Sequence, residues 1–438
     1  MEDTKCSQGR FLRIIITLFF FLLSTSQFTM AGTHVKYLPG FDGPLPFYLE
    51  TGYIGVGKSE EVQLFYYFIK SESDPQVDPL VLWLVGGPGC SGVYAIANEI
   101  GPVRLDSREY NGSLPTLSYN QYAYTKVANI IFIDSPVETG FSYSQTQNGR
   151  HTDTHLACEQ AYQFLRKWLV ENPQYQSNPF YVGGDSYGGI FVPITTRVIS
   201  DGIEAGLEPR VNLKSLERDC GGEYQEIDPK NTLCLQHVHT FKKLLTGIYK
   251  YHILEPVCDS NSTEVHKHSS QRRSLDEKFE KLKSPITLPG MKCREHWWHL
   301  SENWINDDAV QEALHVRKGT IGIWEYCNNN LPYTSTVEDA VPYHAYLSTK
   351  GYRSLIYSGD HDLTVTFQST QAWIKSLNYS IIEEWRPWTF GGQIAGYTKT
   401  YSNRMTYATV KGSGHTAPEW NPAECLTMLR RWLYYKPL

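Results

Sequence analysis

Gly184-Asp185-Ser186-Tyr187-Gly188 is a Gly-x-Ser-x-Gly pattern that follows the short apolar run Pro179-Phe180-Tyr181-Val182. The stretch behind it, residues 189–202, has the character of a helix. A strand, a sharp turn with a serine at its tip and a helix together form the context of a nucleophile elbow. Glycine two residues before and two after the serine lets strand and helix pack closely while the hydroxyl stays exposed. The pattern therefore predicts that Ser186 is a catalytic nucleophile.

Two later segments provide the partners that such a serine needs. A serine hydroxyl is a poor nucleophile, so it requires a base and an acid that orients the base. Gly359-Asp360-His361-Asp362 and Gly412-Ser413-Gly414-His415-Thr416 each follow a strand-like run. Loops at the carboxyl ends of parallel strands are where sheet enzymes place catalytic groups, in the order serine, acid, histidine. We expect His415 to be the base, and the residues alone leave Asp362 and Asp360 open as the acid.

A glycine-rich turn offers a site for the oxyanion. Gly86-Gly87-Pro88-Gly89-Cys90 follows the apolar run 79–85. A tetrahedral oxyanion needs two preorganised donors. We expect one backbone N–H from this turn and a second from Tyr187, the residue after the nucleophile.

The apolar pattern predicts an α/β fold. Strand-like runs alternate with helical patterns, which indicates a mainly parallel sheet covered on both faces. We expect residues 32–206 and 342–438 to form the two parts of the core, with an irregular, cysteine-rich insertion at 207–341. The strand-like runs lie at 62–70, 79–85, 128–134, 353–358 and 405–410, and the helical patterns at 155–171, 367–377 and 423–434.

The first 31 residues differ from the rest. Lys5, Arg10 and Arg13 precede an apolar run at 14–23, which is too short to span a bilayer comfortably. We interpret 1–31 as a cleaved signal peptide, with an uncleaved anchor as the alternative. The mature protein is then expected in the secretory pathway, secreted or vacuolar, and away from the membrane. Three Asn-x-Ser/Thr sequons fit a secreted glycoprotein: Asn111, Asn261 and Asn378.

Composition excludes several classes of protein. Hydrophobic residues make up 41% of the 438 residues, which indicates a large core, and the net charge of −6 argues against a nucleic-acid partner. Cys293, His296 and His299 have a spacing found in metal sites, but the adjacent Trp297-Trp298 suggests packing instead. We expect no metal and no cofactor, because no phosphate loop or dinucleotide fingerprint is present.

Taken together, these segments resemble the serine carboxypeptidase-like family of α/β-hydrolases from about residue 44 to the end. Besides the elbow, the resemblance rests on four motifs: Trp83-Leu84-Val85-Gly86-Gly87-Pro88-Gly89-Cys90-Ser91-Gly92, Asp134-Ser135-Pro136-Val137-Glu138-Thr139-Gly140-Phe141-Ser142-Tyr143-Ser144, Tyr357-Ser358-Gly359-Asp360-His361-Asp362 and His415-Thr416-Ala417-Pro418-Glu419.

The resemblance implies an α/β-hydrolase fold with a disulfide-stapled insertion, or lid, and a Ser-Asp-His triad that forms an acyl-enzyme. It selects Asp362 as the acid beside Ser186 and His415, and it places the oxyanion donors at Gly87 and Tyr187. It also implies three disulfides and two cysteines outside them: Cys90–Cys327, Cys220–Cys234 and Cys258–Cys293, with Cys158 and Cys425 remaining.

Two positions depart from the carboxypeptidase members of that family. Carboxypeptidases hold the peptide's terminal carboxylate with an asparagine and a glutamate, where this chain has Val85 and Asp185. With Trp83 and Gly86, these residues make up the expected substrate site. Asp185 and two later segments, Trp385-Arg386-Pro387-Trp388 and Gln393-Ile394-Ala395-Gly396-Tyr397, resemble the plant acyltransferase branch, which moves acyl groups from 1-O-acyl glucose esters to alcohols.

Three hypotheses follow from these features. The first is an acyltransferase that uses a glucose ester and an alcohol acceptor, and the second is a carboxypeptidase that acts on peptides. The third is an inactive or poorly folded form. Family members continue after Val211-Asn212-Leu213-Lys214 into a further strand, a Gly-Asn-Pro loop and a helical hairpin, whereas this chain passes directly to Ser215-Leu216-Glu217-Arg218-Asp219-Cys220. The resemblance therefore implies an internal deletion after Lys214, such as an alternative splice form.

Overall fold

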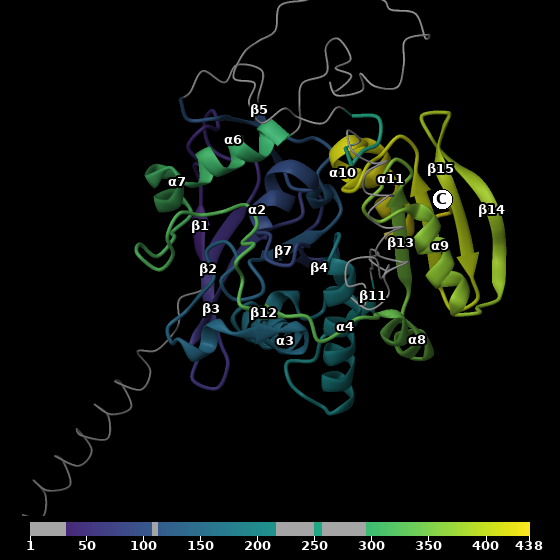
Figure 1. The fold of residues 1–438 in the computed structure, drawn as a ribbon, viewed down its shortest axis with the longest axis horizontal. Helices are drawn as coiled ribbons and strands as arrows, with labels where there is room; N and C mark the ends of the chain where they lie inside the picture. The colour runs from purple at the N-terminus through teal and green to yellow at the C-terminus, as the bar shows by residue number, and fades with distance from the viewer. Residues whose placement is uncertain (1–31, 107–112, 216–248, 256–294) are drawn as a thin grey trace, which may run out of the picture.

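The structure is a computed structural model that describes residues 32–106, 113–215, 249–255 and 295–438. Its strands form a large mixed sheet and a separate four-stranded sheet, with helices packed around both (Figure 1). Two further pairs of short strands complete the description: β5 (Val103–Asp106) with β6 (Thr116–Tyr119), and β9 (Thr152–Asp153) with β12 (Tyr333–Thr334).

The large sheet is parallel at its centre and antiparallel towards its N-terminal edge. Strand β4 pairs in parallel with β7 on one side and β10 on the other, whereas β1, β2 and β3 pair as antiparallel neighbours. Its order is β1 (Thr33–Val35), β2 (Leu49–Val56), β3 (Val62–Ile69), β7 (Asn129–Ile133), β4 (Leu80–Leu84), β10 (Phe180–Gly184) and β11 (Leu213–Ser215), with β8 (Tyr143–Ser144) on β3.

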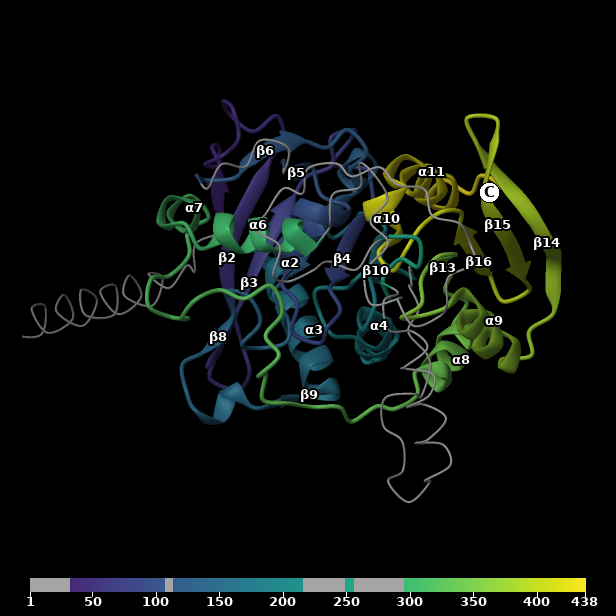
Figure 2. The same ribbon diagram turned by 45° about the horizontal axis from the view of Figure 1, so that its top comes forward.

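The second sheet holds the loops that follow the elbow in sequence. Strands β13 and β16 pair in parallel, and β15 and β14 extend the sheet with antiparallel pairing. Figure 2 shows this sheet on the far side of α4 from β2 and β3. Its order is β13 (Ser354–Gly359), β16 (Met405–Val410), β15 (Gln393–Tyr401) and β14 (Ile381–Phe390).

The large sheet is buried on both faces. In β3, Phe65 and Tyr67 join one hydrophobic core, while Leu64 and Tyr66 join another on the opposite face. Side chains alternate between the two faces of a strand, so a strand buried on both faces needs a continuous apolar run. This explains why β3 is apolar or aromatic at almost every position.

Helices supply the cover for these cores. Helix α3 begins after Asp153, whose carboxylate accepts the backbone N–H groups of His155 and Leu156. The helices are α2 (Gly92–Tyr94), α3 (Thr154–Glu171), α4 (Gly188–Glu204), α6 (Glu295–Ile305), α7 (Asp308–Ala313), α8 (Val341–Thr349), α9 (Phe367–Ser376), α10 (Ala417–Trp420) and α11 (Pro422–Leu433). Short turns of other helical types are η1 (Ala95–Glu99), η2 (Tyr124–Lys126), η3 (Asn148–Arg150) and η4 (Pro173–Tyr175).

The sheet is interrupted next to the elbow strand. Strand β11 has three residues and covers Phe180–Val182 of β10, which leaves Gly183 and Gly184 beyond its end. Among the described residues, β13 has β16 as its only strand partner. The interruption follows Lys214, the position after which the resemblance implies an internal deletion.

Several sequence expectations lie outside the described residues. These are the signal peptide at 1–31, the sequons Asn111 and Asn261, and the pairs Cys220–Cys234 and Cys258–Cys293. The domain boundaries at 206/207 and 341/342 stay a prediction. Over the described parts of the chain, none of the helices combines the length and apolar character needed to cross a membrane.

Candidate active site

The tip of the elbow has a strained backbone. Ser186 has φ of 52°, in the left-handed region that non-glycine residues seldom adopt. A Cβ atom at Gly184 or at Gly188 would lie 2.4 Å from the carbonyl oxygen of Leu84. Both glycines are therefore required for strand β10 and helix α4 to approach β4 while the serine stands at the tip of the turn.

Ser186, His415 and Asp362 form a continuous hydrogen-bonded relay. Ser186 Oγ lies 2.8 Å from His415 Nε2, and His415 Nδ1 lies 2.8 Å from Asp362 Oδ2. Because an ionised carboxylate only accepts, it assigns the proton to Nδ1 and leaves Nε2 to accept from the serine hydroxyl. Asp362 and His415 are 7% and 6% exposed, so both are shielded from water.

The two aspartates of the acid loop have different partners. Asp362 Oδ1 accepts the backbone N–H groups of Thr364 and Val365, at 2.7 and 3.2 Å, which fixes the carboxylate that faces His415. Asp360 Oδ1 instead accepts the N–H of Gly412, at 2.7 Å. Asp360 thus links the acid loop to the loop that precedes His415. Of the two aspartates, Asp362 is the one that faces the imidazole of His415.

The glycine-rich turn after β4 lies against the nucleophile. A Cβ atom at Gly86 would lie 2.6 Å from the Cβ of Ser186 and 2.8 Å from the backbone nitrogen of Tyr187. Gly87 has φ of 113°, a conformation open to glycine. The turn that carries Gly87 therefore approaches Ser186 and the backbone nitrogen of Tyr187 through Gly86, and the oxyanion roles of Gly87 and Tyr187 stay predictions.

A buried aspartate supports this turn. Asp134 is fully buried, and its Oδ1 accepts from Ser91 Oγ at 2.6 Å and from the Gly92 N–H at 2.8 Å. Its Oδ2 accepts the Phe141 N–H at 2.9 Å. Desolvation raises the pKa of Asp134 to about 6, although these hydrogen bonds act in the opposite direction.

Residues 249–255, from the predicted insertion, lie across both catalytic loops. The Tyr251 carbonyl accepts the backbone N–H of His415 at 2.7 Å, and the Lys250 carbonyl accepts that of Leu363 at 3.0 Å. Ile253 donates its N–H to the carbonyl of His361, also at 3.0 Å. This segment therefore holds the acid loop and the base loop through main-chain hydrogen bonds.

The expected substrate residues Trp83, Val85 and Asp185 are buried near the elbow strand. They are 2%, 3% and 2% exposed, respectively. The indole of Trp83 packs against the ring of Tyr124 in the core. Their roles in binding stay predictions, and Gly86 beside them keeps the space over Ser186 open.

A disulfide links the glycine-rich turn after β4 to the second half of the chain. Cys90 and Cys327 form a disulfide, and Cys158 and Cys425 are buried. Backbone hydrogen bonds from Ser91 and Asn328 flank this bridge. Asn378, the sequon within the described residues, is exposed.

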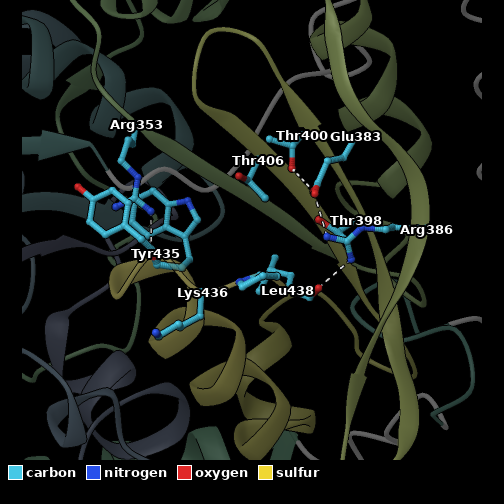
Figure 3. Close-up of a pocket in the computed structure, with 11 residues that line it drawn as sticks. Arg353, Glu383, Arg386, Thr398, Thr400, Thr406, Tyr435, Lys436 and Leu438 are labelled. Atoms are coloured by element: carbon cyan, nitrogen blue, oxygen red, sulfur yellow. Dashed lines mark hydrogen bonds and ion pairs between the residues drawn. The ribbon is translucent and has the colours of Figure 1, made fainter.

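A separate cavity of about 120 Å³ lies between the β14–β16 strands and the C-terminal segment (Figure 3). Its arginines already have partners, since Arg386 donates to Glu383 and to the Leu438 carbonyl, and Arg353 stacks on Trp432 and Tyr435. No triad residue lines it. In the described parts of the chain, no group of three metal-ligating side chains is present.

Comparison with protein-family models finds the serine carboxypeptidase model at residues 39–217 and 214–434. The chain belongs to the serine carboxypeptidase family. Two Arabidopsis thaliana relatives, Serine carboxypeptidase-like 9 and Serine carboxypeptidase-like 11, are each 46% identical to it. Those matches cover 95% and 98% of this chain, and 98% and 99% of the relatives.

A solved structure identifies the fold. Kex1(delta)p, a prohormone-processing carboxypeptidase from Saccharomyces cerevisiae, superposes with a TM-score of 0.68 at 16% identity, over 89% of this chain and 92% of that one. At this identity the likeness establishes the fold alone, which is that of an α/β-hydrolase. Family and fold together make this chain a serine carboxypeptidase-like enzyme.

The comparisons also show that a relative has residues that this chain lacks. The match to Serine carboxypeptidase-like 11 spans 462 positions, more than the 438 residues of the chain, so the relative has residues without a counterpart here. The family model matches in two stretches that meet at 214–217. The break in the match therefore falls where β11 ends and the large sheet stops.

Sequence reasoning missed two supporting parts of the site. Asp134 was noted only as part of a family motif, and its contact with the oxyanion turn depends on a fold that brings residues 42 positions apart together. Residues 249–255 carry no motif at all. The one local signal is a cluster of aromatic rings, those of Tyr249, Tyr251 and His252.

Proposed function

We propose that this enzyme transfers acyl groups from 1-O-acyl glucose esters, in particular esters of phenolic acids, to alcohol acceptors. The observation that carries the proposal is the relay from Ser186 through His415 to Asp362, with both hydrogen bonds at 2.8 Å. Such a relay activates a serine for attack on an ester carbonyl and serves acyl transfer in general.

In the first half-reaction, Ser186 Oγ attacks the ester carbonyl carbon and its proton passes to His415 Nε2. The carbonyl oxygen becomes an oxyanion, which accepts from the backbone N–H groups of Gly87 and Tyr187. The intermediate then collapses, the bond to the glucose oxygen breaks, and His415 returns the proton to that oxygen. Glucose leaves, and the acyl group remains as an ester on Ser186.

In the second half-reaction, an alcohol takes the place of glucose. His415 removes the alcohol proton while the alcohol oxygen attacks the acyl-enzyme carbonyl, and the same two N–H groups stabilise the oxyanion. Collapse breaks the bond to Ser186 Oγ, which regains its proton from His415. The imidazolium formed in each half-reaction is stabilised by the Asp362 carboxylate.

Two side chains favour transfer over peptide cleavage. A peptide's terminal carboxylate loses its hydration in the site and needs hydrogen-bond donors in return. The side chain of Val85 has no polar atom, and the Asp185 side chain is one methylene shorter than a glutamate. Each missing partner costs on the order of 1–3 kcal/mol.

The test compares two assays on the same protein. Purified enzyme is given a 1-O-acyl glucose ester with an alcohol, or a dipeptide, and products are separated by chromatography. We expect the ester of the alcohol to form and the dipeptide to be hydrolysed more slowly. We expect Ser186→Ala to abolish both reactions. Dipeptide cleavage without transfer would contradict the proposal and favour the carboxypeptidase alternative.

Location and completeness are part of the same proposal. We place the enzyme in the secretory pathway, secreted or vacuolar, on the basis of the expected signal peptide. The interrupted sheet favours one further alternative, an inactive or poorly folded form. Labelling of the secreted protein with a fluorophosphonate, which reacts with an activated serine, distinguishes an active form from an inactive one. If the triad is assembled, the probe labels Ser186. If the triad is not assembled, the soluble protein stays unlabelled.

A further inference from the structure

One buried histidine outside the triad contacts both catalytic loops. His252, in the 249–255 segment, is 7% exposed. Its Nε2 lies 3.2 Å from the Gly412 carbonyl oxygen, in the loop that precedes His415. The same atom lies 3.4 Å from Nδ1 of His361, the residue before Asp362.

The partners of His252 define its protonation. A carbonyl oxygen only accepts, so the contact with Gly412 places a proton on Nε2. The backbone N–H of Leu254 donates to Nδ1 at 3.3 Å, which requires a lone pair there. The ring is thus the neutral Nε2–H tautomer, with one nitrogen bound to its own segment and the other to the base loop.

Other groups around this ring complete its setting. The imidazole stacks on Trp420, with ring centroids 5.3 Å apart, and the Trp420 indole N–H donates to Glu255. The ring also packs edge to face against His361. His361 in turn lies 3.8 Å from Asp360, which accepts the Gly412 N–H.

We propose that His252 is a positioning residue that fixes the acid loop and the base loop relative to each other. Its neighbour Tyr251 accepts the His415 N–H through its carbonyl, so the direction of the 249–255 backbone sets the height of His415 above Ser186. A Cβ atom at Gly414 would lie 2.1 Å from that carbonyl, which shows how closely the two backbones meet. This inference rests on the proposed catalytic role of Ser186 and is independent of the acyl donor.

Rotation of the His252 ring would remove its contact with His361 in the acid loop and its hydrogen bond to the base loop. The base loop would lose the hydrogen bond between His252 and the Gly412 carbonyl, and the main-chain hydrogen bond from His415 to Tyr251 would still hold it to the segment. A displacement of His415 by a fraction of an ångström lengthens the contact to Ser186 Oγ, and proton transfer depends steeply on that distance. The expected effect is on the rate of serine activation rather than on folding.

The test uses fluorophosphonate labelling of Ser186 in the full chain, because labelling reports on the triad without any acyl substrate. His252→Phe keeps a ring for stacking on Trp420 but has no hydrogen-bonding nitrogen, whereas His252→Gln keeps a donor and an acceptor. We expect His252→Phe to lower the second-order labelling rate constant by roughly tenfold to a hundredfold. We expect His252→Gln to remain within about threefold of wild type, with the final labelled fraction unchanged in both.

His344→Phe is the matched control. His344 is 5% exposed and packs at a tilt against Trp373, with ring centroids 4.5 Å apart, and it lies on α8 rather than in the 249–255 segment. We expect its labelling rate constant to equal that of wild type. Equal rate constants for wild type and His252→Phe would overturn the proposal. A lower labelled fraction in His252→Phe with an unchanged rate constant would also overturn it, because that result indicates a folding defect. Labelled enzyme that transfers no acyl group would contradict the proposed function alone.

Discussion

Val85 follows β4 at the entrance to the glycine-rich turn, and its side chain is 3% exposed. We predict that Val85→Asn raises kcat/KM for dipeptide hydrolysis, because an amide donor replaces part of the carboxylate's lost hydration. A gain of 1–3 kcal/mol corresponds to roughly 5- to 150-fold. Dipeptide kinetics beside Val85→Ala, which adds space but no donor, provide the measurement. No gain over the alanine variant would contradict the argument.

Asp362 and Asp360 form a natural matched pair. Asp362→Asn is expected to reduce the labelling rate of Ser186 on the order of 10³- to 10⁴-fold, because an amide can donate to Nδ1 and so favours the wrong tautomer of His415. Asp360→Asn retains an oxygen that accepts from Gly412 and is expected to lose less than about tenfold. The measurement is the rate of fluorophosphonate labelling of each variant. Equal losses would mean that loop rigidity, not the tautomer, limits activity.

At this scale, local motifs predicted the residue types well and their partners less well. Ser186, His415 and the glycine turn each stand in a short pattern whose steric reason holds in the structure, as the close approach of Gly184 to Leu84 shows. The choice between Asp360 and Asp362 depends on which way each side chain points. Only the resemblance made that choice from sequence, and the structure places Asp362 beside the imidazole.

Among the elements, the loop that begins at Asp134 makes the stability of the fold depend on pH. Burial raises the pKa of Asp134 to about 6, against about 3.9 for an unfolded aspartate. Between about pH 4 and pH 6 the unfolded chain releases this proton while the folded chain keeps it. The unfolded state then binds fewer protons, so this group's contribution to the free energy of unfolding falls by about 2 kcal/mol as pH rises through this range.

Asp134→Asn removes that titration. We predict that the free energy of unfolding of the wild type, relative to that of Asp134→Asn, falls by about 2 kcal/mol from pH 4 to pH 6. Urea unfolding of both proteins at pH 4, 5 and 6 measures it. A difference that stays constant across this range would show that Asp134 is ionised at pH 4 in the folded protein.

Elements were predictable where burial imposes a pattern. The expected strand at 405–410 matches β16, and the expected helix at 155–171 differs from α3 by one residue. The sequence pattern does not predict the strands β14 and β15. Most side chains of β14 are exposed, so no apolar alternation marks it, and Pro387 argues against a strand except at a sheet edge.

The whole molecule is divided where the chain lacks residues that its relatives have. In the described residues, β13 pairs on one side only, although all six of its residues are buried. Ser186 follows β10 of the large sheet, whereas Asp362 and His415 follow β13 and β16 of the other sheet. The relay thus spans two sheets that share no strand pairing among the described residues, and packing such as that of Tyr181 on Trp432 joins them.

This division leads to a prediction for the chain as a unit. Inserting, after Lys214, the additional residues that Serine carboxypeptidase-like 11 carries is expected to raise the free energy of unfolding. A buried strand contributes an amount comparable with the net stability of a domain, roughly 5–15 kcal/mol. Restored pairing would also fix β13 against β10 and so hold the two halves of the triad at a constant distance.

Thermal melting and Ser186 labelling of the chain, the extended chain and the relative provide the measurement. We expect the extended chain to melt close to the relative, with the present chain below both and with a lower labelled fraction. An insert of equal length built from glycine and serine is the control, because it lengthens the loop without supplying a strand. Equal melting and labelling of the present chain and the relative would mean that packing between the two sheets holds the triad together without the additional strand.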